Sequence, residues 1–215
     1  YNPSSLRIHK ELAQGSLGKM LSIKAVLTWS RAGAYYTESP WRGQLATEGG
    51  SLLINQAIHT LDLMPWFAGG VTRLKGVVDS GELADVTEGE DSAMATLHFT
   101  NGARGLFYAS NCNTMDSPLW LEIHCERGSL LLNDNTLWRI TPGERFRLES
   151  DASPDGTAKS YWGLGHQQAI RRFYHAIHHP ESTDFTDIRT AGKSIKLVEA
   201  FYRSSQLRQW IDINN

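Results

Sequence analysis

The sequence predicts a single α+β domain in which an open, predominantly antiparallel sheet is covered by helices on one face. Three observations support this fold class. Strand-like segments separated by tight-turn dipeptides fill the middle of the chain, helical patterns lie on either side of them, and no repeat or low-complexity linker divides the 215 residues. The chain is 40% hydrophobic with a net charge of -2, which is typical of a globular protein. Residues 1–215 are therefore expected to form one domain.

The first part of the chain predicts a helix, a strand and a long loop. Apolar residues recur at helical spacing in residues 3–14, and Gly15 ends this predicted helix. Residues 18–31 alternate between apolar and polar side chains and predict a strand. Residues 32–50 contain glycines, a proline and large aromatic residues without any periodicity. They predict a loop, and a loop of this length in a compact domain is usually functional.

A strongly apolar helix is predicted after this loop. Ser51 is its expected N-cap, and the apolar residues up to Phe67 predict one continuous helix that is buried nearly all the way round. In such a helix Asn55 and His59 lie one turn apart, about 6 Å along the axis, and Asp62 borders the same face. A buried polar group without a partner costs about 1–3 kcal/mol, so these three residues indicate a shared network or a pocket.

Six strand-like segments follow the helix. Asn101-Gly102, Arg127-Gly128 and Asp134-Asn135 mark tight turns between them, which predicts an antiparallel meander. Within residues 95–100 every second residue is apolar and the residues between them are polar. One face of the sheet is therefore expected to pack on helices, while the other face is more polar. A broad exposed sheet is often covered by a symmetric partner, which predicts a homodimer or homotetramer through the open face. The segments are residues 71–80, 91–100, 103–112, 119–126, 128–133 and 136–141.

The C-terminal part of the chain predicts a loop over residues 149–163 and then two helices. The first helix covers residues 166–179 and ends at Pro180. The second covers residues 187–210, with Asp187 as its N-cap candidate. Its predicted core stripe consists of Ile195, Val198, Phe201 and Tyr202.

Composition argues against several classes of partner and site. The 21 basic and 23 acidic residues leave no excess of positive charge, so no nucleic-acid partner is expected. No apolar run approaches the roughly 20 residues that cross a bilayer. Cys112 and Cys125 lack CxxC spacing and predict reduced core thiols, which fits a cytoplasmic protein. The sequence starts at Tyr1 without an initiating methionine or a signal-peptide pattern, which predicts a fragment of a longer protein.

Only residues 163–168, GLGHQQ, approach a phosphate-binding glycine motif. Gln168 stands where GxGxxG requires its third glycine, and no buried strand precedes the segment. The chain is therefore expected to contain no dinucleotide-binding half of its own. Considered alone, His166 in this segment predicts a helix cap or a core contact more strongly than a catalytic group.

His59 is the leading candidate for acid/base chemistry. An imidazole beside an apolar pocket, with a pKa tunable across neutrality, suits proton transfer to or from a hydroxyl group. The helix alone leaves an equal alternative open, in which His59 is a core histidine bound to Asp62 or to a backbone carbonyl. A metal site made of these residues and Asn55 is disfavoured, because Asn is a poor ligand and no second His or Cys lies nearby in sequence. No metal is expected.

The loop before this helix carries a candidate binding surface. Trp41 precedes Arg42, and the pair suits an anionic or flat polar ligand because guanidinium groups bind phosphate or carboxylate and indole rings stack. Tyr35 and Tyr36 lie on the same loop. The alternative is a surface loop anchored by one aromatic side chain.

Residues 35–69, YYTESPWRGQLATEGGSLLINQAIHTLDLMPWFAG, closely resemble the signature region of the Gfo/Idh/MocA family, the relatives of glucose-fructose oxidoreductase and inositol dehydrogenase. The resemblance extends along essentially the whole chain. Its specificity comes from the combination of a glycine pair, the Trp-Arg pair and the spacing of Asn55, His59 and Asp62.

The resemblance implies a two-domain enzyme of which this chain is the second domain. In the family, an N-terminal Rossmann domain binds NAD or NADP, and a C-terminal α/β domain supplies the substrate pocket and a sheet used for oligomerisation. The family's Glu-Lys-Pro motif, which ends the Rossmann domain, is not found in residues 1–215. The dinucleotide-binding domain is therefore expected to be missing from this chain, and the fragment alone is expected to be inactive and to bind no cofactor.

By this resemblance His59 corresponds to the catalytic histidine, which removes a proton from the substrate hydroxyl while a hydride passes to the nicotinamide. Asn55 stands where many members have an aspartate. Because an amide cannot take up a proton, Asn55 is expected to orient the substrate and not to relay protons. Asp62 is expected to be structural, holding the helix or the imidazole in place.

The expected function is that of the substrate-binding and oligomerisation domain of an NAD(P)-dependent dehydrogenase that oxidises or reduces a secondary hydroxyl of a sugar, nucleotide-sugar or cyclitol. The alternative is a non-catalytic dimerisation or ligand-binding module without a cofactor domain. The expected substrate-binding residues are Asn55, Tyr36, Arg42 and His166, and the expected cofactor-binding residues are Trp41 and Arg42.

Overall fold

The computed structural model describes residues 1–151 and 165–213, which form seven helices and nine strands. The strands are β1 (Met20–Thr28), β2 (Val71–Asp79), β3 (Ser92–Phe99), β4 (Arg104–Ser110), β5 (Trp120–Cys125), β6 (Gly128–Asn133), β7 (Thr136–Thr141), β8 (Glu144–Ser150) and β9 (Ile211–Asp212). The helices are α1 (Pro3–Gln14), α2 (Gly33–Thr37), α3 (Leu45–Glu48), α4 (Leu52–Asn55), α5 (Ile58–Ala68), α6 (Gly165–His178) and α7 (Ile188–Leu207).

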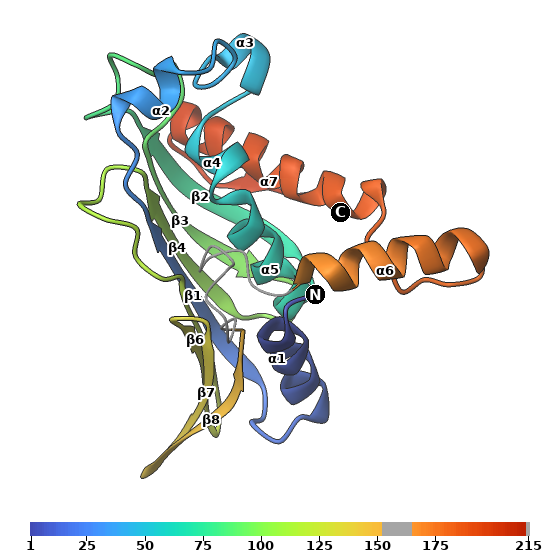
Figure 1. Cartoon of the computed structure of the whole chain (residues 1–215). Helices are drawn as coiled ribbons and strands as arrows, with labels where there is room; N and C mark the ends of the chain where they lie inside the picture. The colour runs from blue at the N-terminus through green and yellow to red at the C-terminus, as the bar shows by residue number, and fades with distance from the viewer. Residues whose placement is uncertain (152–164, 214–215) are drawn as a thin grey trace.

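The described strands form one open sheet in the order β8-β7-β6-β5-β1-β4-β3-β2-β9 (Figure 1). The predicted single meander is wrong, because β1 lies between two meanders, parallel to β4 and antiparallel to β5. Ile23, Ala25 and Leu27 of β1 are buried, and the central position gives both edges of this strand a hydrogen-bonding partner. The predicted tight turns are confirmed, and Asp134 and Asn135 have the φ angles of 50° and 54° that a two-residue hairpin turn requires.

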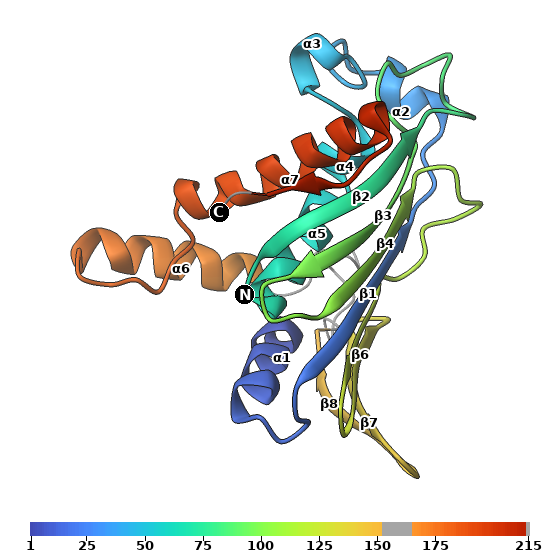
Figure 2. The ribbon, with the colours of Figure 1, turned by 180° about the vertical axis from the view of Figure 1, so that it is seen from behind.

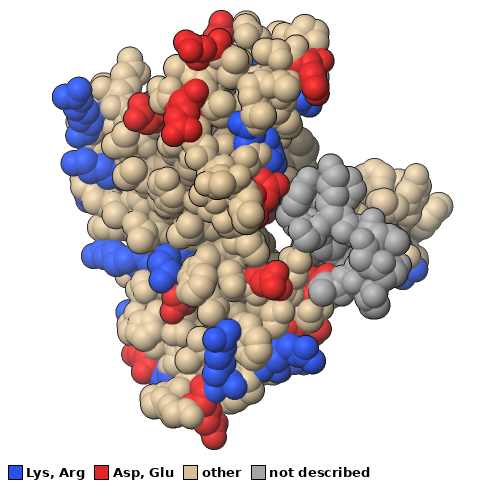
Figure 3. Space-filling model, turned by 60° about the vertical axis from the view of Figure 1, so that its left-hand side comes forward, with Lys and Arg blue, Asp and Glu red and all other residues tan. Residues whose placement is uncertain are grey.

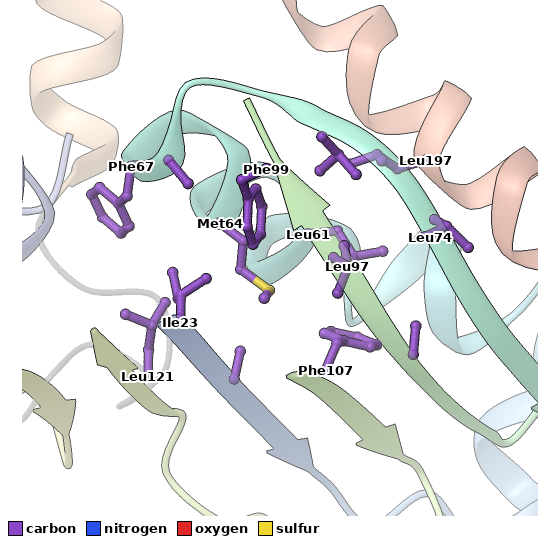
Figure 4. Close-up of a cluster of buried hydrophobic side chains, with 14 of the residues drawn as sticks. Ile23, Leu61, Met64, Phe67, Leu74, Leu97, Phe99, Phe107, Leu121 and Leu197 are labelled. Atoms are coloured by element: carbon purple, nitrogen blue, oxygen red, sulfur yellow. The ribbon is translucent and has the colours of Figure 1, made fainter. Parts of the chain in front are cut away.

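Helices α1, α4, α5 and α7 cover one face of this sheet (Figures 1 and 2), which confirms the predicted α+β architecture. A single hydrophobic core fills the space between the two layers. Figure 4 shows Leu61 and Met64 of α5 and Leu197 of α7 facing Leu97 and Phe107 of the strands. This layer fixes α5, which carries His59, against the centre of the sheet.

The opposite face of the sheet is open to solvent. In β3, Ala95, Leu97 and Phe99 are buried and Thr96 is exposed, as the alternation predicts. The open face is nevertheless less polar than expected. Figure 3, which turns the left-hand side of Figure 1 forward, shows mostly uncharged surface. An apolar row crosses five neighbouring strands at matching register positions, and its members are Val77, Met94, Tyr108, Val26 and Trp120.

The predicted continuous helix from Ser51 to Phe67 is interrupted, so that prediction is wrong. It is replaced by α4 and α5, which are separated at residues 56–57. The Ser51 side chain does not cap α4; the carboxylate of Glu90 accepts the Leu53 N–H at 2.6 Å instead. Helix α5 is also not buried all the way round, since His59, Asp62 and Trp66 are exposed while Leu61 and Met64 face the core.

The last helix begins as predicted. Asp187 is the N-cap of α7, and its carboxylate accepts the Thr190 N–H at 2.9 Å. The predicted core stripe is partly wrong, because Ile195 is 40% exposed. The buried face of α7 instead passes from Ser194 through Leu197, Val198 and Phe201, since the sheet lies under that side of the helix.

The remaining predictions concern loops, thiols and excluded sites. The predicted loop over residues 32–50 contains α2 and α3, and most of the predicted loop over residues 149–163 lies outside the described residues. Cys112 and Cys125 are free thiols, as predicted. In the part of the chain that the structure describes, no helix combines the length and apolar content needed to cross a bilayer, and no group of three or more His, Cys, Asp and Glu side chains offers a metal site.

Candidate active site

A pocket of about 360 Å³ lies where α3, the end of α4 and the first turn of α5 meet. Its wall combines one imidazole, one carboxylate, one amide and one hydroxyl with three apolar side chains. The lining residues are Trp41, Thr47, Glu48, Ile54, Asn55, Ile58 and His59. The structure therefore brings three of the sequence-predicted residues, Trp41, Asn55 and His59, to one site.

His59 presents an exposed side chain to this pocket, yet the surrounding protein removes much of its hydration. Desolvation is the largest cause that lowers the pKa of His59 below its ordinary value of 6.5. The electrostatic interaction with Asp62 raises this pKa, and the interaction with His166 lowers it. The net lowering keeps the imidazole neutral at pH 7, so His59 can accept a proton.

Asn55 and Glu48 form a fixed pair on the pocket wall. The Asn55 amide donates to one carboxylate oxygen of Glu48 at 2.7 Å, and the Gly43 N–H donates to the other at 2.5 Å. The chain turns directly after Glu48 because Gly49 adopts the left-handed conformation, with φ 81°. This turn lets the C-terminal residue of α3 face the C-terminal residue of α4.

Tyr36 does not reach the pocket. Its side chain is only 3% exposed, and its hydroxyl accepts hydrogen bonds from the Asn111 amide at 2.9 Å and from the Ser51 hydroxyl at 3.3 Å. Burial raises the pKa of this hydroxyl above its ordinary value. The Asn111 amide also donates to Gln56 at 3.1 Å. Tyr36 therefore joins α2 to the residues around α4 and supports the pocket from behind.

Arg42 also lies outside the pocket wall. Its guanidinium group donates to the Tyr35 carbonyl at 2.5 Å and stacks over the Tyr35 ring at 4.1 Å. Trp41 is 46% exposed, lines the pocket, and lies 5.1 Å from the same guanidinium group. The predicted pair is thus divided, with the indole ring at the site and the arginine directed toward Tyr35.

His166 and Asp62 flank His59 without lining the pocket. His166 lies in the first turn of α6, close enough for its charge to affect the pKa of His59. Asp62 accepts a hydrogen bond from the Ser194 hydroxyl at 2.7 Å, which connects α5 to α7. This bond is the structural contact expected of Asp62.

The family model of the GFO/IDH/MocA C-terminal domain matches residues 5–131. The chain belongs to this family. A search of curated protein sequences gave no match.

Several solved structures share the fold of this GFO/IDH/MocA domain. The WlbA dehydrogenase from Bordetella pertussis, in complex with NADH and UDP-GlcNAcA, is 21% identical with a TM-score of 0.80, over 100% of this chain and 60% of that chain. Levoglucosan dehydrogenase, in complex with NADH and levoglucosan, is 20% identical with a TM-score of 0.77, and the match covers 96% of this chain and 62% of that chain. An NAD binding oxidoreductase from Klebsiella pneumoniae is 15% identical with a TM-score of 0.79, and the match covers 99% of this chain and 64% of that chain. This chain therefore spans about three fifths of the length of these relatives.

Sequence reasoning missed two carboxylates of this GFO/IDH/MocA domain. Glu48 lies seven residues before Asn55, but the two glycines between them break any helical pattern that could have linked the two side chains. Glu90 is only 4% exposed and accepts both the Leu53 N–H and the Tyr202 hydroxyl, each at 2.6 Å. It holds the start of α4 from a loop far away in sequence, and no local pattern indicates this contact.

Proposed function

We propose that this GFO/IDH/MocA chain is the substrate-binding and oligomerisation domain of an NAD(P)-dependent oxidoreductase that acts on a secondary hydroxyl of a sugar, nucleotide-sugar or cyclitol. The observation that carries the proposal is the imidazole of His59 lining one pocket with the Asn55–Glu48 pair, where desolvation lowers its pKa. Dehydrogenases that bind a nucleotide-sugar or levoglucosan share this fold, which supports the substrate class.

In the proposed oxidation His59 is the general base. The substrate hydroxyl donates its proton to the unprotonated ring nitrogen of His59, while the carbinol carbon gives up a hydride and becomes a carbonyl carbon. In the reverse direction the protonated imidazole returns the proton to the new alkoxide. Asn55, held by Glu48, orients a neighbouring hydroxyl and transfers no proton.

NAD or NADP, when bound, supplies the acceptor for the hydride. The described residues fit the edge of such a cofactor site, because Trp41 offers an exposed flat ring at the pocket and Arg42 places a guanidinium group beside it. The proposed dinucleotide-binding domain lies in the part of the protein outside residues 1–215, since solved relatives are longer than this chain. The free thiols fit a cytoplasmic location.

Helix α6 favours an enzyme with a further domain over the alternative, a stand-alone module. Figures 1 and 2 show α6 projecting from the body, with its first residues near the N-terminus of the chain. The Tyr1 ring lies 4.8 Å from the Arg172 guanidinium group of this helix. One side of α6 carries a helical stripe of exposed apolar residues, which a domain preceding Tyr1 would cover. The stripe consists of Ile170, Phe173, Tyr174 and Ile177.

Replacement of His59 in the intact enzyme tests the catalytic proposal. His59→Ala removes the proton acceptor, so turnover with NAD(P) should fall by roughly 100- to 10,000-fold. His98→Ala is the matched control, because His98 lies on β3 at the open side of the sheet and contacts Trp210. Near-normal turnover of the His59 variant would contradict the assignment.

Micromolar binding of NADH to residues 1–215 alone, measured by calorimetry, would contradict the proposed second domain.

A further inference from the structure

We propose that Glu48 makes this pocket select a neutral polyhydroxy ring, a pyranose or a cyclitol, and reject rings that carry a carboxylate. The inference rests on the proposed function and concerns the ring that bears the reacting hydroxyl. Three features of the site support this inference. They are the position of the Glu48 carboxylate, its hydrogen bonds, and the absence of charge on the other described lining residues.

The Glu48 carboxylate is held in one orientation at the pocket wall. Its two oxygens accept from donors on two different segments, the Gly43 backbone and the Asn55 side chain. A carboxylate offers about four acceptor sites, so these two bonds leave about two. Glu48 also lines the pocket, and among the described residues it forms no ion pair with Lys or Arg. The remaining lone pairs are available to hydroxyl donors of a ligand.

The charge of the pocket wall has one sign. Glu48 is its only charged residue, and the described lining contains no Lys or Arg. Arg42, whose guanidinium group lies 5.1 Å from the Trp41 ring, is outside the wall and is held by the Tyr35 carbonyl and ring. A ligand carboxylate would therefore meet a fixed carboxylate without a compensating cation, whereas a ligand hydroxyl can donate to it.

The rest of the wall suits a neutral sugar ring. Trp41, Ile54 and Ile58 provide an apolar surface for the C–H face of a pyranose or cyclitol. Thr47 and Asn55 add neutral donors and acceptors at the polar edge, where His59 also lies. Adjacent hydroxyls on one edge of the ring can then bind Glu48 and Asn55 while a third faces the imidazole.

The test compares neutral sugars with their uronates on the intact enzyme. Each of a panel of neutral pyranoses, such as D-glucose and D-galactose, is paired with its 6-carboxylate, and binding is measured by calorimetry and ligand-observed NMR. The wild-type protein should bind the neutral member at least about 10-fold more tightly, which is the usual cost of an uncompensated like charge at close range.

The Glu48→Gln variant tests the effect of the Glu48 charge on ligand preference while nearly keeping the size of the side chain. It keeps an acceptor for the Asn55 amide and removes the negative charge, so the preference for the neutral member should fall at least about fivefold. Glu38→Gln, an exposed acid of the same loop outside the pocket wall, is the matched control and should leave the preference unchanged. A purely structural role for Glu48 would lower the melting temperature without changing the ratio between the two ligands, and that result would overturn the inference.

Two other outcomes are distinguishable. Tighter binding of a uronate than of its neutral partner by the wild-type protein would overturn the selection of neutral rings and leave the sugar dehydrogenase proposal standing. Failure of every neutral sugar, cyclitol and uronate in the panel to bind or to be turned over would overturn both proposals.

Discussion

At the scale of single residues, the chemistry of the site depends on the charges around His59. The ring belongs to α5, the carboxylate of Asp62 lies on the same helix, and His166 comes from α6. Desolvation and His166 favour the neutral imidazole, while Asp62 opposes them. Residues of two helices, α5 and α6, thus adjust the proton affinity of His59, and the sign of each contribution can be measured.

Histidine NMR titrations of residues 1–215 should give a midpoint for His59 below 6.5, because its pKa is lowered from that value. His166→Gln should raise the midpoint and Asp62→Asn should lower it further. Since the base must be neutral, oxidation by the intact enzyme should increase as the pH rises through this midpoint and should then level off.

Ser194→Ala is the control for the Asp62 variant. It removes the hydrogen bond between α7 and α5 but keeps the charge of Asp62, so it should shift the His59 midpoint much less than Asp62→Asn does. A midpoint at or above 6.5 in the wild-type chain would contradict the role of desolvation.

The residues that could be predicted from the sequence are those whose role depends on local spacing. Asn55 and His59 come together because both are near the junction of two consecutive helices, and Trp41 reaches the site through the connecting loop. Tyr36 and Arg42, which were also expected at the site, lie outside the pocket wall and contact Asn111 and the Tyr35 carbonyl. These partners depend on the folded loop and on strand-end positions, which residue type alone does not indicate.

At the scale of elements, α4 is positioned by a close approach at Gly50. A Cβ at Gly50 would overlap the Tyr202 hydroxyl and would lie 3.4 Å from Ile54. Tyr202 donates to Glu90, and Glu90 in turn accepts the Leu53 N–H at the start of α4. Gly50 therefore leaves room for the chain of contacts that places Asn55 at the pocket.

Gly50→Ala should destabilise the domain by about 1–3 kcal/mol, because the added methyl group must displace Tyr202. Urea unfolding of residues 1–215 measures this change in the free energy of unfolding. The cost should be smaller when the same substitution is made in a Tyr202→Phe background, since the overlapping hydroxyl is then absent.

Gly192→Ala is the matched control. Gly192 lies inside α7, and a Cβ there would meet nothing within 4 Å, so the substitution should stabilise the domain by up to about 1 kcal/mol. Equal stabilities of the two alanine variants would contradict the role given to Gly50.

Elements with strong local signals could be predicted, and the interruption between α4 and α5 could not. Turn dipeptides and alternating side chains located seven of the nine described strands, all but β8 and β9, and Asp187 located the start of α7. By contrast, the start of α4 is held by Glu90, a carboxylate distant in sequence that replaces the expected cap at Ser51. Tertiary contacts of this kind override local helix propensity.

At the scale of the whole molecule, the apolar row on the open face supports the proposed oligomer. Val77 pairs with Met94, and Met94 pairs with Tyr108, so the exposed side chains form one continuous line. Val26 and Trp120 continue the line across β1 and β5. In the proposed oligomer this row would be buried against the same row of a second copy in a twofold-symmetric interface.

Met94→Lys should weaken self-association, because it places a charge within the row, between Val77 and Tyr108. Sedimentation at tens of micromolar protein should show a shift from dimer or tetramer toward monomer. Met115→Lys is the control, since Met115 is also an exposed methionine but lies in a loop outside the row. A wild-type chain that is monomeric at these concentrations would contradict the proposed interface for this domain.

The position of β1 also constrains when the sheet can be completed during synthesis. Ile23 pairs with Gly105 on one side and with Ile123 on the other, although β1 precedes every other described strand of this sheet in the chain. Both edges of β1 stay without their strand partners until β4 and β5 have left the ribosome, while β2 and β3 can already pair with each other. Contacts this distant in sequence are slow to form, so β1 gains both of its neighbours later than β3 does, whose partners β2 and β4 adjoin it in sequence.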